Sequence, residues 1–255
     1  MPFAPYTGYV PCSQTSLSCR VEDLHSKHSA KRTLGLLLRT IFCAIPLIKD
    51  CKVCRSAIIE KHYRQAEKQT VCIADLGEHF SVSNLAKDDL SETGTPCILY
   101  GELFTTYGET ISQIESRTNK TGGMVLSKKG DLLFPSSTTV DAVSLIAPSV
   151  INIDNVVLGG DMFGIHINSN FDAQYLSYFF NHIAKRRLAK YAKGSTIIHL
   201  HYADIEKAKL LLPCLKEQHR MAKWLVSLDD KINIETLSLN LLNNQKTYLL
   251  RHMFI

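Results

Sequence analysis

The sequence lacks the short motifs that mark several classes of enzyme. It contains no Asn/Asp-Pro-Pro-Tyr/Phe loop, which adenine methyltransferases use to hold a flipped base. It has no G-x-x-x-x-G-K-[ST] loop for nucleotide phosphates, and its glycine pairs at 122–123 and 159–160 stand outside any cofactor loop. A G-x-S-x-G nucleophile motif is also absent. These absences predict that the chain is not itself an enzyme.

Long apolar runs are missing as well. The most apolar stretch, residues 34–48, is interrupted by Arg39 and Pro46 and is too short and too broken to span a membrane. The N-terminus has no basic start followed by an apolar run, so no secretory signal is evident. The chain has eight cysteines, which we expect to be reduced thiols. We therefore expect a cytoplasmic protein.

The cysteines do not form a complete metal-binding pattern. Cys51 and Cys54 make one C-x-x-C, but no second pair stands at the spacing of a zinc site. Cys43 and His62 could complete a set, and a redox pair is a further alternative, although a poor strand precedes the motif. Thiols without either role are the favoured interpretation. We expect no metal and no cofactor in this chain.

The amount and balance of charge are compatible with nucleic acid without being diagnostic. Lys and Arg number 29 against 24 Asp and Glu, which gives a net charge of +5. Hydrophobic residues make up 45% of the 255 residues, enough to build a core in one or two domains. The distribution of the cations therefore carries more information than their total.

The C-terminal segment from residue 213 carries a long apolar seam. Positions spaced alternately by four and three residues are apolar, apart from Glu235 and Lys246, and no Pro or Gly interrupts them. The apolar positions are Met221, Leu225, Leu228, Ile232, Leu239, Leu242, Leu249 and Met253. A helix of roughly 38 residues would be about 57 Å long, and its stripe needs a covering partner. The helix could pack on its own domain, but a two-helix or intermolecular coiled coil is favoured.

The remaining sequence suggests two further parts. Residues 1–70 are unassigned: 1–33 read as loop, 34–48 as a short helix that ends before Pro46, and 52–69 as a polar helix. Residues 71–212 mix many short strands with one clear helix that Asp172 caps and that continues to about Ala192. This pattern predicts an α+β domain with an irregular twisted sheet, followed by the long helix over 213–255.

One cluster of cations is a candidate for contact with phosphates. Five cations fall within residues 185–193, and Arg186, Lys190 and Lys193 are spaced to share one helical face. Such a face could bind phosphates with an affinity that falls as salt rises. A solvated outer helix face is the alternative. Ser195 and Thr196, directly after this cluster, join the set of candidate DNA contacts.

A second group of donors surrounds a predicted hairpin. Lys128 and Lys129 precede a Gly-Asp turn, and a run of hydroxyls follows the next strand. The hydroxyl residues singled out as DNA contacts are Ser136, Ser137 and Thr138. Lysine amines and hydroxyls suit phosphates and base edges, while an ordinary polar turn is the alternative.

Several stretches, in order, resemble the specificity subunits of type I restriction-modification systems. Pro213, Glu217-Gln218 and the segment from Met221 to Ile232 resemble the entry to the conserved helix of that family, with Met221 where Ile is common. The Gly-Asp-Leu-Leu hairpin from residue 130 matches a second family feature. The segments 84–111 and 193–213 resemble the opening of the target recognition domain and the approach to the long helix. The resemblance covers about residues 71–255 and leaves 1–70 outside.

The resemblance implies a half-length specificity subunit with one target recognition domain. The domain would read one half of a split double-stranded DNA target through the major groove, and the long helix would act as a spacer. With room for one recognition domain only, we expect a homodimer through the C-terminal helix. The family also implies a modification subunit that brings S-adenosylmethionine and a restriction subunit that uses ATP. The alternative is a coiled-coil interaction module without DNA specificity, which salt-sensitive DNA binding would exclude.

Overall fold

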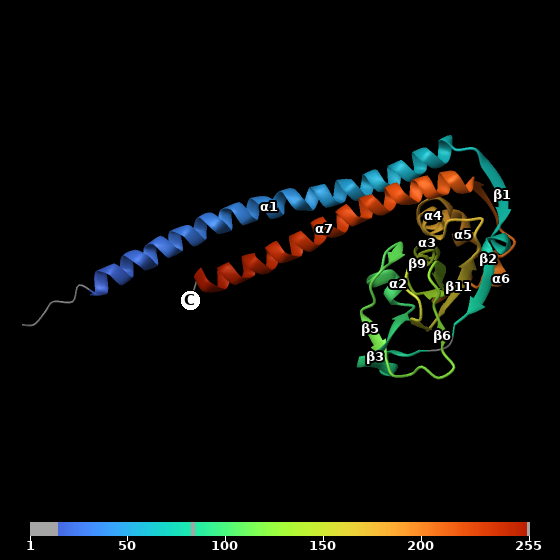
Figure 1. Ribbon diagram of the computed structural model, residues 1–255, viewed down its shortest axis with the longest axis horizontal. Helices are drawn as coiled ribbons and strands as arrows, with labels where there is room; N and C mark the ends of the chain where they lie inside the picture. Colours follow the sequence, from blue (N-terminus) through green and yellow to red (C-terminus); the bar gives the residue numbers. More distant parts are fainter. Residues whose placement is uncertain (1–14, 83–84, 254–255) are drawn as a thin grey trace, which may run out of the picture. The chain divides into compact units, whose positions relative to one another are not determined.

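The computed structural model describes residues 15–82 and 85–253, and their side chains from residue 31 to residue 252 (Figure 1). The chain divides into two compact units. The first unit contains the described parts of Met1–Lys52 and Asp230–Ile255, and the second is Val53–Asp229. No helix in the described ranges is long and apolar enough to cross a membrane.

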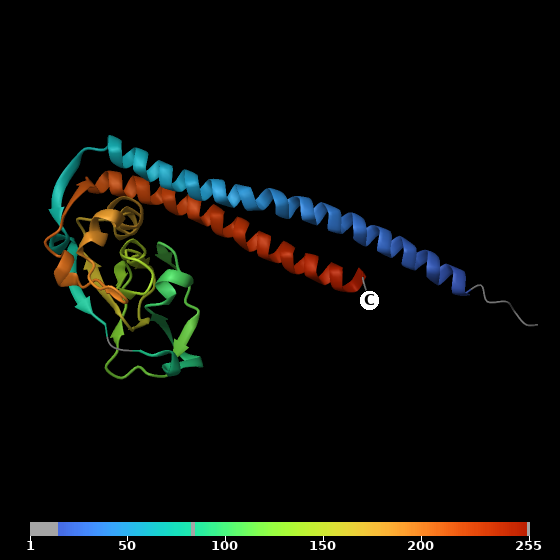
Figure 2. The same ribbon diagram turned by 180° about the vertical axis from the view of Figure 1, so that it is seen from behind.

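The first unit is built from two helices that lie side by side in both views (Figures 1 and 2). Helix α1 spans Thr15–Gln65 and helix α7 spans Leu215–Met253, and each continues into the second unit. In α1, the more covered positions within this unit are spaced by three and four residues, as in a coiled coil. They are Leu34, Leu37, Ile41, Ala44, Ile48 and Cys51. This stripe is the partner of α7 within the unit.

The extent of α1 corrects two expectations. The residues from 15 to 33 are helical rather than loop, and the helix does not end before Pro46 but continues to Gln65. A proline inside a helix removes one hydrogen bond and costs about 3 kcal/mol. Pro46 lies on the exposed face of α1, so the covered residues Ala44 and Ile48 keep their packing and offset that cost.

The seam of α7 is covered, as predicted, but its partners lie within the chain. Met221 and Leu225 are buried in the core of the second unit, and Ile232 is buried in the first. Leu228, Leu239, Leu242 and Leu249 are half-buried. The seam is therefore not left unpaired, and it gives no argument for a homodimer. Met253 lies at the helix end, beyond the residues whose side chains are described.

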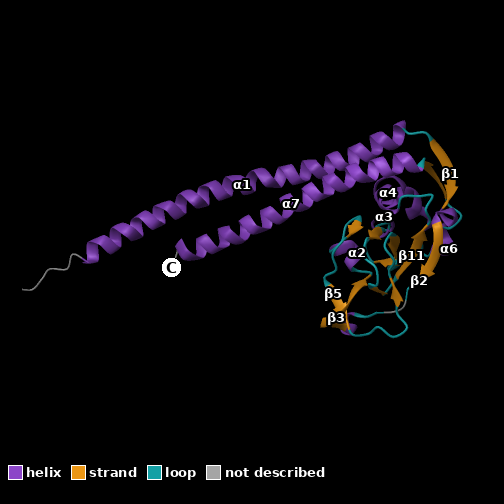
Figure 3. Cartoon of the chain, viewed as in Figure 1, coloured by secondary structure: helices purple, strands orange, loops and turns teal. Residues whose placement is uncertain are grey.

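The second unit is a mixed α/β domain with twisted open sheets, as the sequence predicted (Figure 3). The larger sheet has the order β2-β11-β7-β9-β4 and the smaller has the order β5-β3-β10-β6. The strands of the larger sheet are β2 (Gly77–Ser81), β11 (Met162–Ile167), β7 (Asp131–Pro135), β9 (Ser149–Ile151) and β4 (Thr110–Ile111). Those of the smaller sheet are β5 (Ser116–Thr118), β3 (Leu90–Leu99), β10 (Val157–Gly159) and β6 (Val125–Leu126).

Two short ladders complete the strands. Strand β1 (Lys68–Cys72) pairs with β13 (Lys209–Pro213), so the chain leaves α1 and enters α7 through neighbouring strands. Strand β8 (Ser137–Thr138) pairs with β12 (Ile198–His199). The short helices of this unit are α2 (Glu102–Thr105), α3 (Ala142–Leu145), α4 (Ala173–Phe179), α5 (Lys185–Leu188) and α6 (Tyr202–Ile205).

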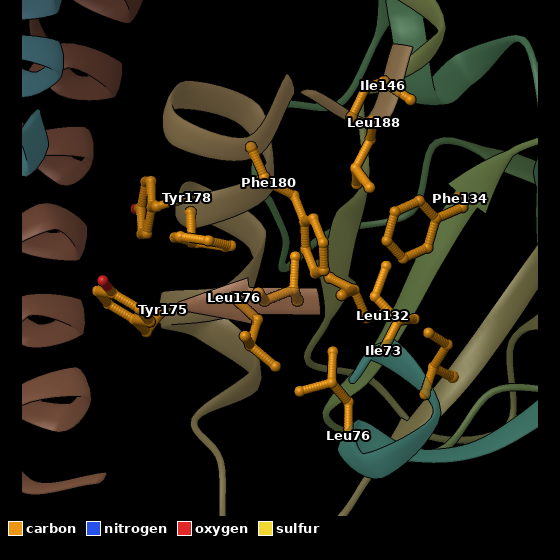
Figure 4. Close-up of a cluster of buried hydrophobic side chains, with 14 of the residues drawn as sticks. Ile73, Leu76, Leu132, Phe134, Ile146, Tyr175, Leu176, Tyr178, Phe180 and Leu188 are labelled. Carbon is orange, nitrogen blue, oxygen red and sulfur yellow. The ribbon is translucent and has the colours of Figure 1, made fainter. Parts of the chain in front are cut away.

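The main core lies between the larger sheet and α4 (Figure 4). Phe134 of β7 stacks on Phe163 of β11 at 5.0 Å and meets the edge of Phe180 at 5.2 Å. Asp172 caps α4, as predicted, because its Oδ1 accepts from the N–H of Tyr175 at 2.8 Å. The expected single helix to Ala192 is instead α4, a π-helical turn, α5 and a 3-10 turn that ends at Tyr191.

Candidate nucleic-acid interface

The ladder of β8 and β12 joins two of the predicted groups of polar residues. Thr138 lies opposite Ile198 and Ser137 opposite His199, although about 60 residues separate them along the chain. The N–H of Leu200 also donates to the carbonyl of Ser136 at 2.9 Å. The ladder therefore brings the hydroxyl run 136–138 next to the segment 193–196, as a single surface.

Hydrogen bonds hold the β8 side of this surface in place. The hydroxyl of Ser137 donates to Oδ2 of Asp161 at 2.9 Å, and the N–H of Ser136 donates to the carbonyl of Asp161 at 2.7 Å. Asp141 then caps α3 by accepting from the N–H of Ser144 at 2.9 Å. The hydroxyl of Ser144 also donates to Asp141, and these bonds hold the pKa of Asp141 below its usual value. The loop from 136 to 141 is thus anchored at both ends.

A tight turn holds the β12 side. Gly194 has a φ of +122°, and a Cβ at this position would lie 2.0 Å from the carbonyl oxygen of Ile197. Glycine is therefore required here. The bridge between Lys193 and His199 closes the turn. Ser195, Thr196 and Ile197 are exposed at its tip as a result.

A groove of about 730 Å³ runs along this surface. One wall is α2 and its flanks, with Tyr100 and Phe104, and the other includes residues 137–140. Lys185 and His199 also line the groove. Hydroxyls, a cation and an imidazole thus line one concavity together with the carboxylates of Glu109 and Asp161, and hydroxyls and cations are groups that can contact nucleic acid.

The predicted cationic face is only partly present. Arg186 and Lys190 are exposed, on α5 and on the 3-10 turn. The helix ends at Tyr191, so Lys193 does not share their face, which corrects that prediction. The Lys193 amine instead lies 2.5 Å from Oδ1 of Asp204 and lowers the pKa of that carboxyl. Part of the charge of Lys193 is therefore already neutralised within the chain.

The other predicted pair lies at the far end of β7. Lys128 and Lys129 form the turn before this strand, with Gly130 at a φ of +91°, whereas Ser136 follows the strand. Five strand residues at about 3.3 Å each separate the two sites by roughly 16 Å. The backbone N–H groups of both lysines are bonded to carboxylates, that of Lys129 to Asp154 at 2.7 Å. The structure does not bring this turn into the groove.

A buried ionic cluster was missed by the sequence analysis. Arg55 contacts both oxygens of Glu109 at 3.1 Å and Oδ1 of Asp229 at 2.5 Å. His182 lies 2.8 Å from Glu109, and the hydroxyl of Tyr178 donates to Asp229 at 2.5 Å. These residues come from α1, α4, α7 and the segments between, so no local pattern could indicate them. The cluster ties the second-unit parts of both long helices to α4.

Among the residues whose side chains are described, the histidines and cysteines do not assemble a metal site. His199 and His201 stack with centroids 6.0 Å apart. No group of three or more His, Cys, Asp or Glu side chains that could hold a metal occurs within the described residues. Cys51 and Cys54 are both free thiols on α1.

Comparisons with known proteins agree with this architecture. A family profile described as type I restriction modification DNA specificity domain matches residues 65–244. No curated protein sequence matches the chain. Among solved structures, the HsdS subunit of Thermoanaerobacter tengcongensis aligns at 12% identity with a TM-score of 0.55, over 89% of this chain and 56% of that one.

Two further structures show the same fold. The S subunit of a type I restriction-modification system from M. genitalium aligns at 15% identity with a TM-score of 0.64, over 89% of this chain and 60% of that one. A chain from a study of complex assembly in the type I R-M system aligns at 13% identity with a TM-score of 0.57, over 91% of this chain and 59% of that one. This chain thus spans somewhat more than half the length of each. The matched domain covers most of the chain, which therefore belongs to the family of type I restriction-modification DNA specificity domains.

Proposed function

We propose that this chain reads one half of a split double-stranded DNA target as the specificity component of a type I restriction-modification complex. The observation that carries the proposal is the β8–β12 ladder, which places hydroxyls beside a groove lined by Lys185, with Arg186 and Lys190 on the following turns. Cations of this kind position a protein on phosphates, and uncharged donors read base edges. Thr138, Ser195 and Thr196 belong to this proposed interface, whereas the predicted contacts Ser136 and Ser137 are only 9% and 4% exposed and serve to hold it in place.

The helical pair is the proposed docking element for partner proteins. In this proposal a modification subunit binds the chain and supplies S-adenosylmethionine chemistry, and a restriction subunit supplies ATP-driven chemistry, so this chain has no catalytic role. The outer face of α7 supports the proposal. Ile234, Leu237, Leu241 and Tyr248 are 60 to 67% exposed on it, at spacings that form a second stripe. We also place the protein in the cytoplasm, in keeping with the free thiols among its described cysteines.

A homodimer remains a prediction. It cannot use the α7 seam while α1 covers that seam, so a dimer formed through α7 would use the outer stripe. A symmetric dimer would then read a palindromic split site.

DNA binding tests the proposal directly. Arg186→Ala and Lys190→Ala should each weaken binding to all duplex sequences and should reduce the slope of log K against log salt by about one. The measurement is fluorescence anisotropy of a labelled duplex over a range of salt concentrations. Lys207→Ala is the matched control, since Lys207 is 93% exposed and lies between α6 and β13, outside the predicted cation cluster. Unchanged binding in both Arg186→Ala and Lys190→Ala would contradict the proposed interface.

The turn at 128–129 provides a second comparison in the same assay. If DNA spans both ends of β7, Lys128→Ala and Lys129→Ala should also weaken binding. If only the groove contacts DNA, these variants should bind like the Lys207→Ala control.

A further inference from the structure

Two adjacent loop tips carry five exposed side chains without charge. Thr139 and Val140 follow β8, and Ser195, Thr196 and Ile197 precede β12. We refer to these five residues as the tip cluster. Val140 is 73% exposed and Ile197 49% exposed, which is unusual for two aliphatic side chains that line the same groove. Thr139 also lines the groove, and Ser195 and Thr196 precede Ile197 on the neighbouring loop, so aliphatic and hydroxyl groups lie close together there.

The backbone holds these side chains outward. The N–H of Val140 donates to the hydroxyl of Thr138 at 3.3 Å, and Asp141 directly afterwards is fixed as the cap of α3. On the other loop, the close approach between Gly194 and the carbonyl of Ile197 fixes the turn. Because both loops are anchored, Val140 and Ile197 cannot turn into the core. Their apolar surface is therefore open to a ligand in the groove, which would cover it.

The hydroxyls of the tip cluster are available for such a ligand. Within the described part of the chain, the side chains of Thr139, Ser195 and Thr196 make no hydrogen bond. By contrast, the amide of Asn181 in the groove donates to the carbonyls of Pro148 and Ser177, at 2.7 and 3.0 Å. The one carboxamide among the groove-lining residues, which is the group suited to adenine, is thus already bonded.

We propose that the tip cluster reads thymine in the DNA half-site, through its 5-methyl group and its O4. This inference rests on the proposed function and specifies the base that the interface selects. In the major groove, thymine presents a methyl group beside the O4 acceptor. Val140 and Ile197 supply apolar contact for the methyl group, and a neighbouring hydroxyl of the tip cluster donates to O4. Guanine is read by Arg or Lys and cytosine by a carboxylate, and the tip cluster contains neither.

The test starts from a random-sequence duplex library from which the purified full chain selects binders. The enriched duplex is resynthesised with deoxyuridine at each thymidine position in turn, which removes only the methyl group. At one or more positions in the half-site, binding should weaken by about fourfold, the amount expected for one buried methyl group. The readout is the dissociation constant measured by fluorescence anisotropy.

Protein variants assign the effect to the tip cluster. Val140→Ala and Ile197→Ala should bind the thymidine duplex more weakly and should no longer distinguish it from the deoxyuridine duplex. Val143→Ala is the matched control, because Val143 is 38% exposed on α3 and does not line the groove. It should retain the full discrimination. All three positions are exposed, so circular dichroism should show an unchanged fold.

The outcomes separate the two proposals. A library that yields no enriched duplex would overturn the proposed function and this inference with it. An enriched duplex that binds equally with thymidine and deoxyuridine at every position would overturn the inference and leave DNA recognition standing. Discrimination that persists in both Val140→Ala and Ile197→Ala would likewise overturn the assignment to the tip cluster.

Discussion

At the scale of single residues, the cluster around Arg55 holds three charged side chains that are largely shielded from water. The side chains of Arg55, Glu109 and Asp229 are only 12 to 16% exposed. One guanidinium therefore balances two carboxylates away from water. Removing one partner of such a group leaves the others buried and uncompensated, which is the costly case for buried charges.

Arg55→Ala should lower the free energy of unfolding by about 3 kcal/mol, because Glu109 and Asp229 would then repel each other in a partly dry site. Urea unfolding monitored by circular dichroism is the measurement. Arg64→Ala is the matched control on the same helix, since its pair with Glu60 is exposed and should contribute less than about 1 kcal/mol. Equal losses in the two variants would show that the cluster is not stabilising.

The same cluster predicts a pH dependence. Burial by itself would raise the pKa of Glu109, but the hydrogen bond with His182 and the charge of Arg55 outweigh it, and the pKa is lowered. A carboxyl group with a depressed folded pKa stabilises the fold above its unfolded pKa of about 4.3. That contribution is lost as the pH falls through the folded pKa.

Glu109→Gln should therefore be less stable than the parent at pH 7, and the difference should shrink as the pH falls from about 5 to 3. The ionisation of Asp229 affects stability in the opposite direction, because burial raises the pKa of its carboxyl group. Asp229 is present in both proteins, so the comparison between them isolates Glu109. Parallel urea titrations across this pH range provide the comparison. A difference that stays constant with pH would mean that the ionisation of Glu109 does not contribute.

At the scale of elements, α7 has two faces with different roles. Ile232 is 5% exposed on the covered seam, and Ile234, two residues further on, is 67% exposed. The two isoleucines have the same chemistry and lie in the same helix, so they form an internal control for each other.

Ile232→Ala should destabilise the fold by about 2–5 kcal/mol, because it leaves a cavity in a packed seam. Ile234→Ala should change the stability by less than about 0.5 kcal/mol. Thermal and urea unfolding would measure both. If Ile234→Ala proved as damaging as Ile232→Ala, the outer stripe would be part of the folding core rather than a free surface.

At the scale of the whole molecule, the chain aligns with 56 to 60% of the length of the three solved chains whose fold it shares. The proposed partners should be sought with all 255 residues of this chain. Light scattering of the chain mixed with a type I modification subunit should show a complex larger than either component.

Replacing Leu237 and Leu241 with Asp should abolish that complex, because both residues are more than 60% exposed on the outer stripe. The folded state should survive, since neither side chain lies on the seam. A complex that forms equally well with the double variant would place the docking surface elsewhere.

The sequence by itself determined the features that depend on local periodicity and turn chemistry. The seam from Met221 to Leu249, the Asp172 cap and the Gly130 turn all follow from short-range rules that tertiary contacts did not override. The family resemblance rested on the same stretches and agrees with the profile match over residues 65–244.

Only the tertiary structure decided which segments become neighbours. Within the first unit the partner of the seam is α1, which the sequence did not indicate as one long helix because Pro46 predicts a break. The β8–β12 ladder and the Arg55 cluster join residues 51 to 174 positions apart, and no period in the chain encodes such separations. Interactions between distant segments depend on how the whole chain packs, so the groove and its tip cluster appear only in three dimensions.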